Sequence, residues 1–132
     1  MPPPLPKAPT KKMPAIQVFG RDDSQATRAA LRFFRERRIV VSFVDLRKRA
    51  IAPGELRRFV ERLGARSVLD ADGRAYRDEG LAYLSTDDEA LMDRMLRDPR
   101  LIRLPLVRHG NDLTAGVDEA AWKAWLTRTT PP

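Results

Sequence analysis

The chain has 132 residues, long enough for one domain with a buried core, and it carries a net charge of +7 at pH 7. Apolar residues make up 42% and charged residues 33% of it, and no apolar run is long enough to span a membrane. Cysteine is absent and His109 is the one histidine, which excludes disulfides, thiolate catalysis and metal sites built from these residue types.

The proline-rich stretch over residues 1–14 predicts a disordered, polyproline-like tail, because proline cannot take part in helix or sheet ladders. It lacks the apolar core of a secretory signal, so the cytoplasm is the expected location and no membrane partner is expected. One folded domain is expected over residues 15–127, followed by a frayed tail over residues 128–132.

A short strand and an amphipathic helix open the domain. Ile16–Phe19 alternates apolar with polar residues and ends at Gly20, a pattern that predicts a strand. A helix to about Arg37 follows, and the stretch Asp22–Ser24 offers three alternative N-caps for it. The positions expected on its buried side are Ala26, Ala30, Phe33 and Phe34.

The stretch Ile39–Leu46 is rich in β-branched and aromatic residues and predicts the second strand. Because one helix separates it from the first strand, we expect a right-handed crossover and a parallel pair. Helices are then predicted over residues 55–64, about 76–83 and 86–96, the last of them capped by Ser85 or Thr86. These helices form an insert between the second strand and the rest of the sheet.

The last third of the chain predicts two strands and a helix. Gly110-Asn111 is a turn dipeptide between two apolar runs, so the strands on either side are expected to pair antiparallel. Asp118 is expected to cap a final helix, in which one of Trp122 and Trp125 packs inward and the other lies partly exposed. The predicted fold is α/β, a mixed sheet in the order β-α-β, helical insert, β-β-α.

This order and several short motifs resemble the arsenate-reductase-like branch of the thioredoxin-fold proteins. That branch includes glutaredoxin-related members and the Spx-type regulators that bind RNA polymerase. The similarity covers about residues 15–127. The stretches that carry it are Val18-Phe19-Gly20, Thr27-Arg28-Ala29, Arg32-Phe33-Phe34, Val44-Asp45-Leu46, ELRRFVERLG at residues 55–64, Asp98-Pro99, Leu104-Pro105-Leu106-Val107 and Thr114-Ala115-Gly116.

The resemblance implies that the catalytic site is degenerate. The family's catalytic cysteine stands at the start of the first helix, where this chain has Ser24. A serine hydroxyl is scarcely ionised near neutral pH and needs an adjacent base, which His109 in the hairpin turn is not expected to supply. The family also has an oxyanion-holding arginine immediately before a proline, where this chain has Leu104. We therefore expect no catalytic residue.

A binding groove is also implied by the resemblance. Thioredoxin-like folds keep a cis peptide at the position of Leu104-Pro105, facing the helix start, and its exposed backbone pairs with an extended peptide or glutathione. Helix capping explains the polar residues of that helix start as well as anion binding does, and Asp22 and Asp23 would repel an anion. The expected groove residues are Ser24, Gln25, Thr27, Arg28, Leu104 and Pro105.

The positive charge is concentrated in the N-terminal half of the chain. Residues 15–66 contain 13 basic and 6 acidic side chains, against 9 and 12 in residues 67–132. Base-stacking aromatic residues are absent from the basic stretches, so nucleic acid is not expected as a direct ligand. The arginines around the first helix form a candidate docking face, and a solvated helix surface is the commoner alternative. This candidate basic docking face consists of Arg28, Arg32, Arg35 and Arg38.

Two functions follow from the resemblance and from the missing residues. The first is a non-catalytic protein that acts by binding, as a Spx-type regulator does when it docks on a protein partner such as RNA polymerase. The alternative is a glutathione-dependent, reductase-like enzyme that positions an external thiol with Ser24, Thr27 and Arg28. The first function needs no cofactor, the second needs glutathione, and a small anion or thiol is a further candidate ligand.

Overall fold

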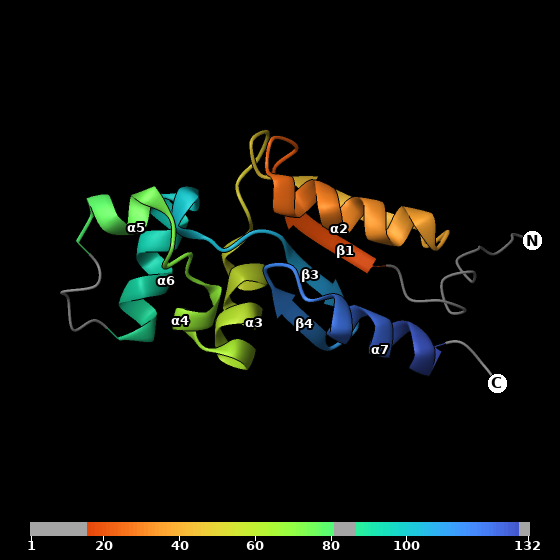
Figure 1. Cartoon of the computed structure of the whole chain (residues 1–132). Coiled ribbons are helices and arrows are strands. Elements are labelled where there is room, and N and C mark those ends of the chain that lie inside the picture. The colour runs from red at the N-terminus through yellow and green to blue at the C-terminus, as the bar shows by residue number, and fades with distance from the viewer. Residues whose placement is uncertain (1–15, 81–86, 130–132) are drawn as a thin grey trace, which may run out of the picture.

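The computed structural model describes residues 16–80 and 87–129, so the predicted tail over residues 1–14 lies outside the described residues (Figure 1). Four strands form one mixed sheet. The strands are β1 (Ile16–Gly20), β2 (Val41–Asp45), β3 (Leu106–His109) and β4 (Asp112–Ala115). The helices are α2 (Gln25–Glu36), α3 (Pro53–Leu63), α4 (Ala65–Val68), α5 (Arg74–Asp78), α6 (Asp88–Arg97) and α7 (Glu119–Thr129), with a 3-10 turn η2 (Pro99–Leu101).

The sheet has the strand order β2-β1-β3-β4. β1 and β2 are parallel, with Ile16 opposite Val41, because α2 carries the chain back over the sheet between them. β3 runs antiparallel to both β1 and β4, and the turn at Gly110 and Asn111 joins β3 to β4. The predicted thioredoxin-like order, β-α-β, helical insert, β-β-α, is therefore confirmed.

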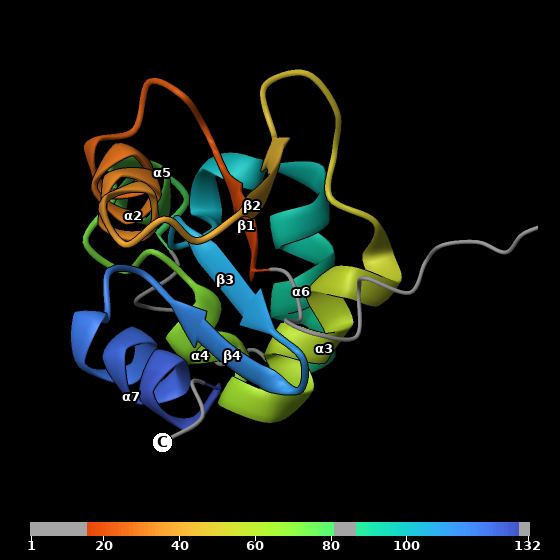
Figure 2. The ribbon, with the colours of Figure 1, turned by 90° about the vertical axis from the view of Figure 1, so that its right-hand side faces the viewer.

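Helices cover both faces of the sheet, as Figure 2 shows. On one face α2 and α7 enclose a core of aromatic and aliphatic side chains, and on the other α3 packs with α4 and α6 around a second core. The first core contains Ile16, Val18, Phe33, Phe34 and Trp122, and the second contains Phe19, Leu56, Phe59, Leu91 and Met95. No helix in the described part of the chain is both long and apolar enough to cross a membrane.

The start of α2 differs from the expected burial pattern. Ala26 is half-exposed, and Thr27 is the buried residue of the first turn, with 0% of its surface exposed. Thr27 packs against Gly20 at the end of β1, where a Cβ would lie 2.4 Å from the Thr27 hydroxyl oxygen. Glycine at position 20 therefore lets the helix approach the strand. In the first turn of α2 the polar Thr27 is buried, and not Ala26 as the sequence predicts.

Both tryptophans of α7 are buried, so the expectation that one would be partly exposed is wrong. Trp122 is 0% and Trp125 6% exposed. Two residues three positions apart on a helix are separated by about 60° around its axis, so both fit within one buried stripe. Asp118 caps α7 as predicted, because its carboxylate accepts the Ala121 N–H at 3.2 Å. The helix continues to Thr129, past the expected domain end at residue 127.

The helical insert shows the largest differences from the sequence-based boundaries. β2 is shorter than Ile39–Leu46, and the short helix expected near residues 76–83 is α5, at Arg74–Asp78. α6 begins at Asp88, and its N-cap is Asp87, which accepts the Ala90 N–H at 2.9 Å. The expected caps Ser85 and Thr86 lie outside the described residues. α4 has four residues, too few for a helical period to be detected in the sequence.

Candidate functional site

Ser24 is the N-cap of α2, the helix whose start carries several of the expected groove residues. Ser24 has extended backbone geometry, and its hydroxyl accepts a hydrogen bond from the Thr27 N–H at 3.2 Å. This is helix capping, which satisfies one of the free N–H groups at the helix start. The two neighbouring carboxylates are also paired, Asp23 with Arg21 at 3.0 Å and Asp22 with Arg47 at 2.7 Å.

The loop before β3 faces this helix start. Leu104-Pro105 is a cis peptide, as the resemblance implies, and Leu104 lines a cavity of about 490 Å³ together with Ser24. Pro105 is buried. The backbone N–H and C=O of Leu104 take part in no hydrogen bond within the part of the chain that the structure describes. These two groups can therefore pair with the backbone of an extended ligand.

Two of the arginines that line the cavity are neutralised within the protein. Arg100 pairs with Asp98 at 2.9 Å, and Arg21 pairs with Asp23. The hydrogen bond from Arg100 lowers the pKa of Asp98 to about 2, and the hydrogen bond from Arg21 lowers the pKa of Asp23. Each of these arginines therefore adds little net positive charge to the cavity.

Arg103 is the cavity arginine that forms no ion pair among the described residues. Its Nε is buried and has no hydrogen-bond partner there. The aliphatic part of the side chain packs over Gly116, where a Cβ would lie 2.9 Å from the Arg103 Cδ. The Nε itself is shielded, but the Arg103 side chain lines the cavity and has no carboxylate partner among the described residues, so the rest of its guanidinium can meet an acidic or oxyanionic ligand there.

Asp70 lines the same cavity and also forms no ion pair among the residues described. The cavity therefore presents one unpaired cation, Arg103, and one unpaired carboxylate. Such a pair matches a ligand that carries both an acidic and a basic group, as a short peptide does.

The structure brings together part of the expected groove. Ser24 and Leu104 line the cavity, whereas Gln25 is exposed on the outer side of α2. The Thr27 side chain is buried against Gly20, and its hydroxyl accepts the Arg21 N–H at 3.3 Å. The guanidinium of Arg28 donates to the Asp22 carbonyl at 3.3 Å. The sequence did not indicate that Arg21, Asp70, Arg100 and Arg103 line the cavity, although Arg103 directly precedes the Leu104-Pro105 motif.

His109 lies far from Ser24. In the sheet register His109 is opposite Ile16, which is the first residue of β1. Ser24 lies near the other end of β1, four residues after its last residue, Gly20. The length of the strand, about 14 Å, separates the two ends. The His109 ring instead stacks on Trp125, with ring centroids 5.8 Å apart. Within residues 16–80 and 87–129 no group of three His, Asp or Glu residues could hold a metal ion.

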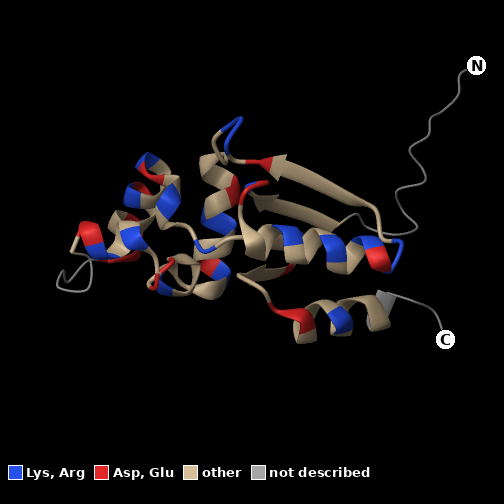
Figure 3. Ribbon diagram, turned by 45° about the horizontal axis from the view of Figure 1, so that its top comes forward, with Lys and Arg blue, Asp and Glu red and all other residues tan. Residues whose placement is uncertain are grey.

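The basic docking face lies along α2 and, with Arg38, just past the end of this helix at Glu36; Figure 3 shows basic residues along the helix. Its members are all exposed, and none of them forms an ion pair with another residue of the described chain. Arg37 differs from them, because its guanidinium lies 3.7 Å from the centre of the Phe33 ring. The positive charge of the docking face is therefore not neutralised within the described protein.

The topology and the groove define a thioredoxin-like protein of the arsenate-reductase type, with serine in place of the nucleophilic cysteine. A family model described as the ArsC family matches residues 19–125. The chain therefore belongs to the ArsC family.

Solved structures share this fold. The YFFB protein is 22% identical, with a TM-score of 0.78 over 83% of this chain and 97% of its own. An arsenate reductase from Vibrio cholerae is 19% identical, with a TM-score of 0.69 over 78% and 90% of the two chains. For an arsenate reductase (ArsC) related protein from Brucella melitensis the identity is 19% and the TM-score 0.67, over 85% and 94%. A comparison with curated proteins found no match.

Proposed function

We propose that this protein acts in the cytoplasm by binding and not by thiol reduction. The observation that carries the proposal is Ser24, which occupies the position of the family's cysteine and whose hydroxyl serves as a helix cap. A capping serine without an adjacent base is a poor nucleophile. The chain also contains no cysteine that could form a mixed disulfide.

The groove is the proposed ligand site. The free backbone groups of Leu104 support pairing with an extended peptide, and the unpaired side chains of Arg103 and Asp70 support a ligand with both charges. Reduced glutathione is a peptide of this kind and serves as the probe. Its titration, followed by amide NMR, is expected to shift residues 24–28 and the residues around Pro105.

Arg103→Ala should weaken glutathione binding by at least about tenfold, because it removes the cavity arginine that has no ion pair among the described residues. Arg74→Ala, in the exposed first turn of α5, is the matched control and should leave the affinity unchanged. Glutathione shifts that are absent, or that are the same in Arg103→Ala, would contradict a ligand site in the groove. Arsenate titrated in parallel tests whether an oxyanion alone is sufficient.

The basic docking face is the proposed contact with a protein partner. An acidic protein surface is the matching chemistry, because the four arginines have no carboxylate partner of their own within the described chain. By resemblance to the Spx-type regulators, RNA polymerase is the first partner to test. Binding to bacterial RNA polymerase, measured by surface plasmon resonance, should weaken by at least about tenfold in Arg32→Gln/Arg35→Gln.

Arg74→Gln/Arg77→Gln removes the same charge from α5 and should leave polymerase binding unchanged. If neither the polymerase nor any specific protein from a cytoplasmic extract binds under gentle salt, the docking role is refuted. Binding that weakens equally in both double variants would show a general charge effect and not a docking face.

A second candidate function is a reductase-like enzyme that uses glutathione as an external thiol. The unpaired guanidinium of Arg103 favours it, because an oxyanion substrate needs such a donor. This function requires turnover of arsenate, or of a mixed disulfide with glutathione, that is lost in Ser24→Ala. Absence of turnover with the unaltered chain removes this candidate.

A further inference from the structure

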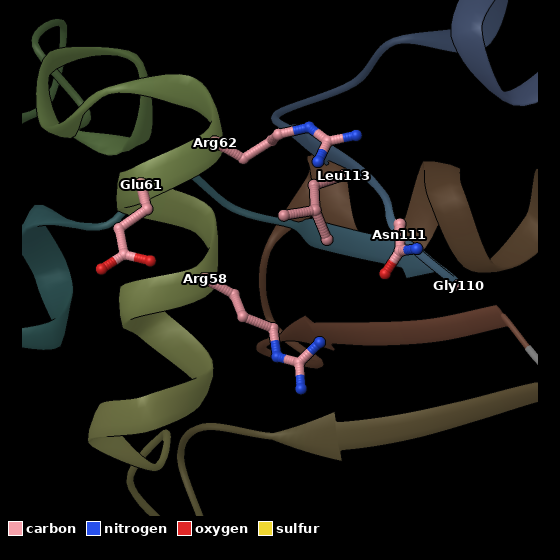
Figure 4. Close-up of a pocket in the computed structure, with 6 residues that line it drawn as sticks. All are labelled: Arg58, Glu61, Arg62, Gly110, Asn111 and Leu113. Atoms are coloured by element: carbon pink, nitrogen blue, oxygen red, sulfur yellow. The ribbon is translucent and has the colours of Figure 1, made fainter.

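A second cleft lies between α3 and the β3–β4 hairpin, and the proposed function does not use it. Figure 4 shows this cleft, which has a volume of about 270 Å³. It is on the α3 side of the sheet, whereas the basic docking face is on α2, which covers the other side. The residues that line the cleft are Arg58, Glu61, Arg62, Gly110, Asn111 and Leu113.

Two arginines of α3 extend into this cleft. Arg58 and Arg62 are four residues apart, so they lie on the same side of the helix, and both side chains reach toward the hairpin in Figure 4. Neither forms an ion pair or a side-chain hydrogen bond within the described part of the chain. Glu61 lies between them in sequence, but its carboxylate points away from the hairpin.

Two other carboxylates, one on α3 and one on α6, are already used in ion pairs. Glu55, at the start of α3, binds Arg108 of β3. Glu89 of α6 binds Arg57 at 3.1 Å. The α3 helix therefore meets the sheet through one ion pair. Glu61 is the carboxylate that lines the cleft beside Arg58 and Arg62, and it forms no ion pair with either of them among the described residues.

The hairpin side of the cleft is neutral. Asn111 supplies an amide and Leu113 supplies an apolar floor. Side chains alternate between the two faces along a strand, so Asp112 faces the same side as Thr114 and not the cleft. Thr114 faces α7, because its hydroxyl accepts a hydrogen bond from Trp122. The cleft therefore combines two guanidinium groups, the carboxylate of Glu61, which pairs with neither of them among the described residues, an amide and a small apolar surface.

We propose that this cleft binds a phosphate group, either as inorganic phosphate or as a small phosphate monoester. Two guanidinium groups match a dianion, whereas a single carboxylate would leave one of them uncompensated. The planar donor fork of arginine fits phosphate oxygens, and the Asn111 amide adds a further donor. Leu113 offers an apolar contact to the carbon atoms of a monoester.

The test is titration of the full chain with inorganic phosphate and with glycerol 3-phosphate at constant ionic strength, followed by amide NMR. Saturable shifts at residues 110–113 and along α3 are expected for a phosphate site. The affinity should fall by at least about tenfold in Arg58→Gln/Arg62→Gln. Arg74→Gln/Arg77→Gln removes the same charge from α5 and should leave the affinity unchanged.

The two phosphate sources are distinguished by their relative affinities. Tighter binding of glycerol 3-phosphate supports a monoester that contacts Leu113, and equal or tighter binding of inorganic phosphate supports recognition of the phosphate group alone. Shifts that do not saturate, or that persist unchanged in Arg58→Gln/Arg62→Gln, overturn the proposal. The amide spectrum of the unliganded double variant verifies that it is folded.

Discussion

Ser24→Cys tests whether the start of α2 still has the environment of a catalytic thiol. In the structure the Ser24 hydroxyl accepts the Thr27 N–H at 3.2 Å, and a thiolate at this position would accept the same hydrogen bond. A hydrogen bond to a charged acceptor contributes about 1.5–3 kcal/mol, and the helix dipole adds about 0.3–1 kcal/mol. The carboxylates of Asp22 and Asp23 oppose a thiolate weakly, because each is paired with an arginine.

The net stabilisation of the thiolate is therefore about 2 kcal/mol, which lowers the pKa of the introduced thiol below its ordinary value of about 8.5. A 2 kcal/mol effect is about thirtyfold in the acid dissociation constant, and it raises the thiolate fraction at pH 7 from about 3% to about half, which is about fifteenfold. The lower intrinsic nucleophilicity of the more acidic thiolate, about fivefold here, reduces the gain in reaction rate to about threefold.

The assay is the rate of alkylation by iodoacetamide between pH 5 and 10. Ser42→Cys is the matched control, because Ser42 is an exposed residue of β2 and lies at no helix terminus. The thiol introduced at Ser24 should react about threefold faster than the control at pH 7. Equal rates for the two variants, or a slower reaction at Ser24, would refute the argument that this helix start favours an anion.

Two further predictions concern stability. Trp122→Phe should lower the free energy of unfolding by about 2–4 kcal/mol, because it loses buried ring volume and the 2.9 Å hydrogen bond to Thr114. Urea denaturation measures this, and a loss below about 1 kcal/mol would contradict it. The lowered pKa of Asp98, about 2, corresponds to about 1–2 kcal/mol after solvent screening of its exposed arginine partner. This stability is present above pH 4 and is lost as the pH falls toward 2. Asp98→Asn should therefore be less stable than the unaltered chain at pH 7 but equally stable at pH 2. Thermal unfolding measured across this pH range tests whether the two stabilities converge.

The fold could be predicted because its signals are local. The alternation in β1, the apolar stripe of α2 and the Gly110-Asn111 turn each define an element within a few residues. The order of these elements then limits the sheet to a parallel crossover and an antiparallel hairpin. The boundaries in the insert were less accurate, because α4 and α5 have four and five residues and little helical periodicity.

The candidate groove was predicted in part. Its framework, Ser24 and Leu104-Pro105, was implied by resemblance, and the two segments do line one cavity. The sequence did not indicate that Thr27 turns inward, because that depends on the space left by Gly20 seven residues earlier. It also did not indicate Asp70 or Arg100, which reach the cavity from the helical insert.

The sequence by itself determined the absence of a thiol, the excess of arginine and the order of strands and helices, because each depends on composition or on neighbouring residues. Only the tertiary structure decided which charges remain unpaired. Arg21 and Arg100 are neutralised by carboxylates two residues away, whereas Arg103 beside Gly116 and Arg58 beside the hairpin form no ion pair within residues 16–80 and 87–129. Whether a charged side chain meets a partner depends on contacts between segments distant in sequence, and those contacts exist only once the chain has folded.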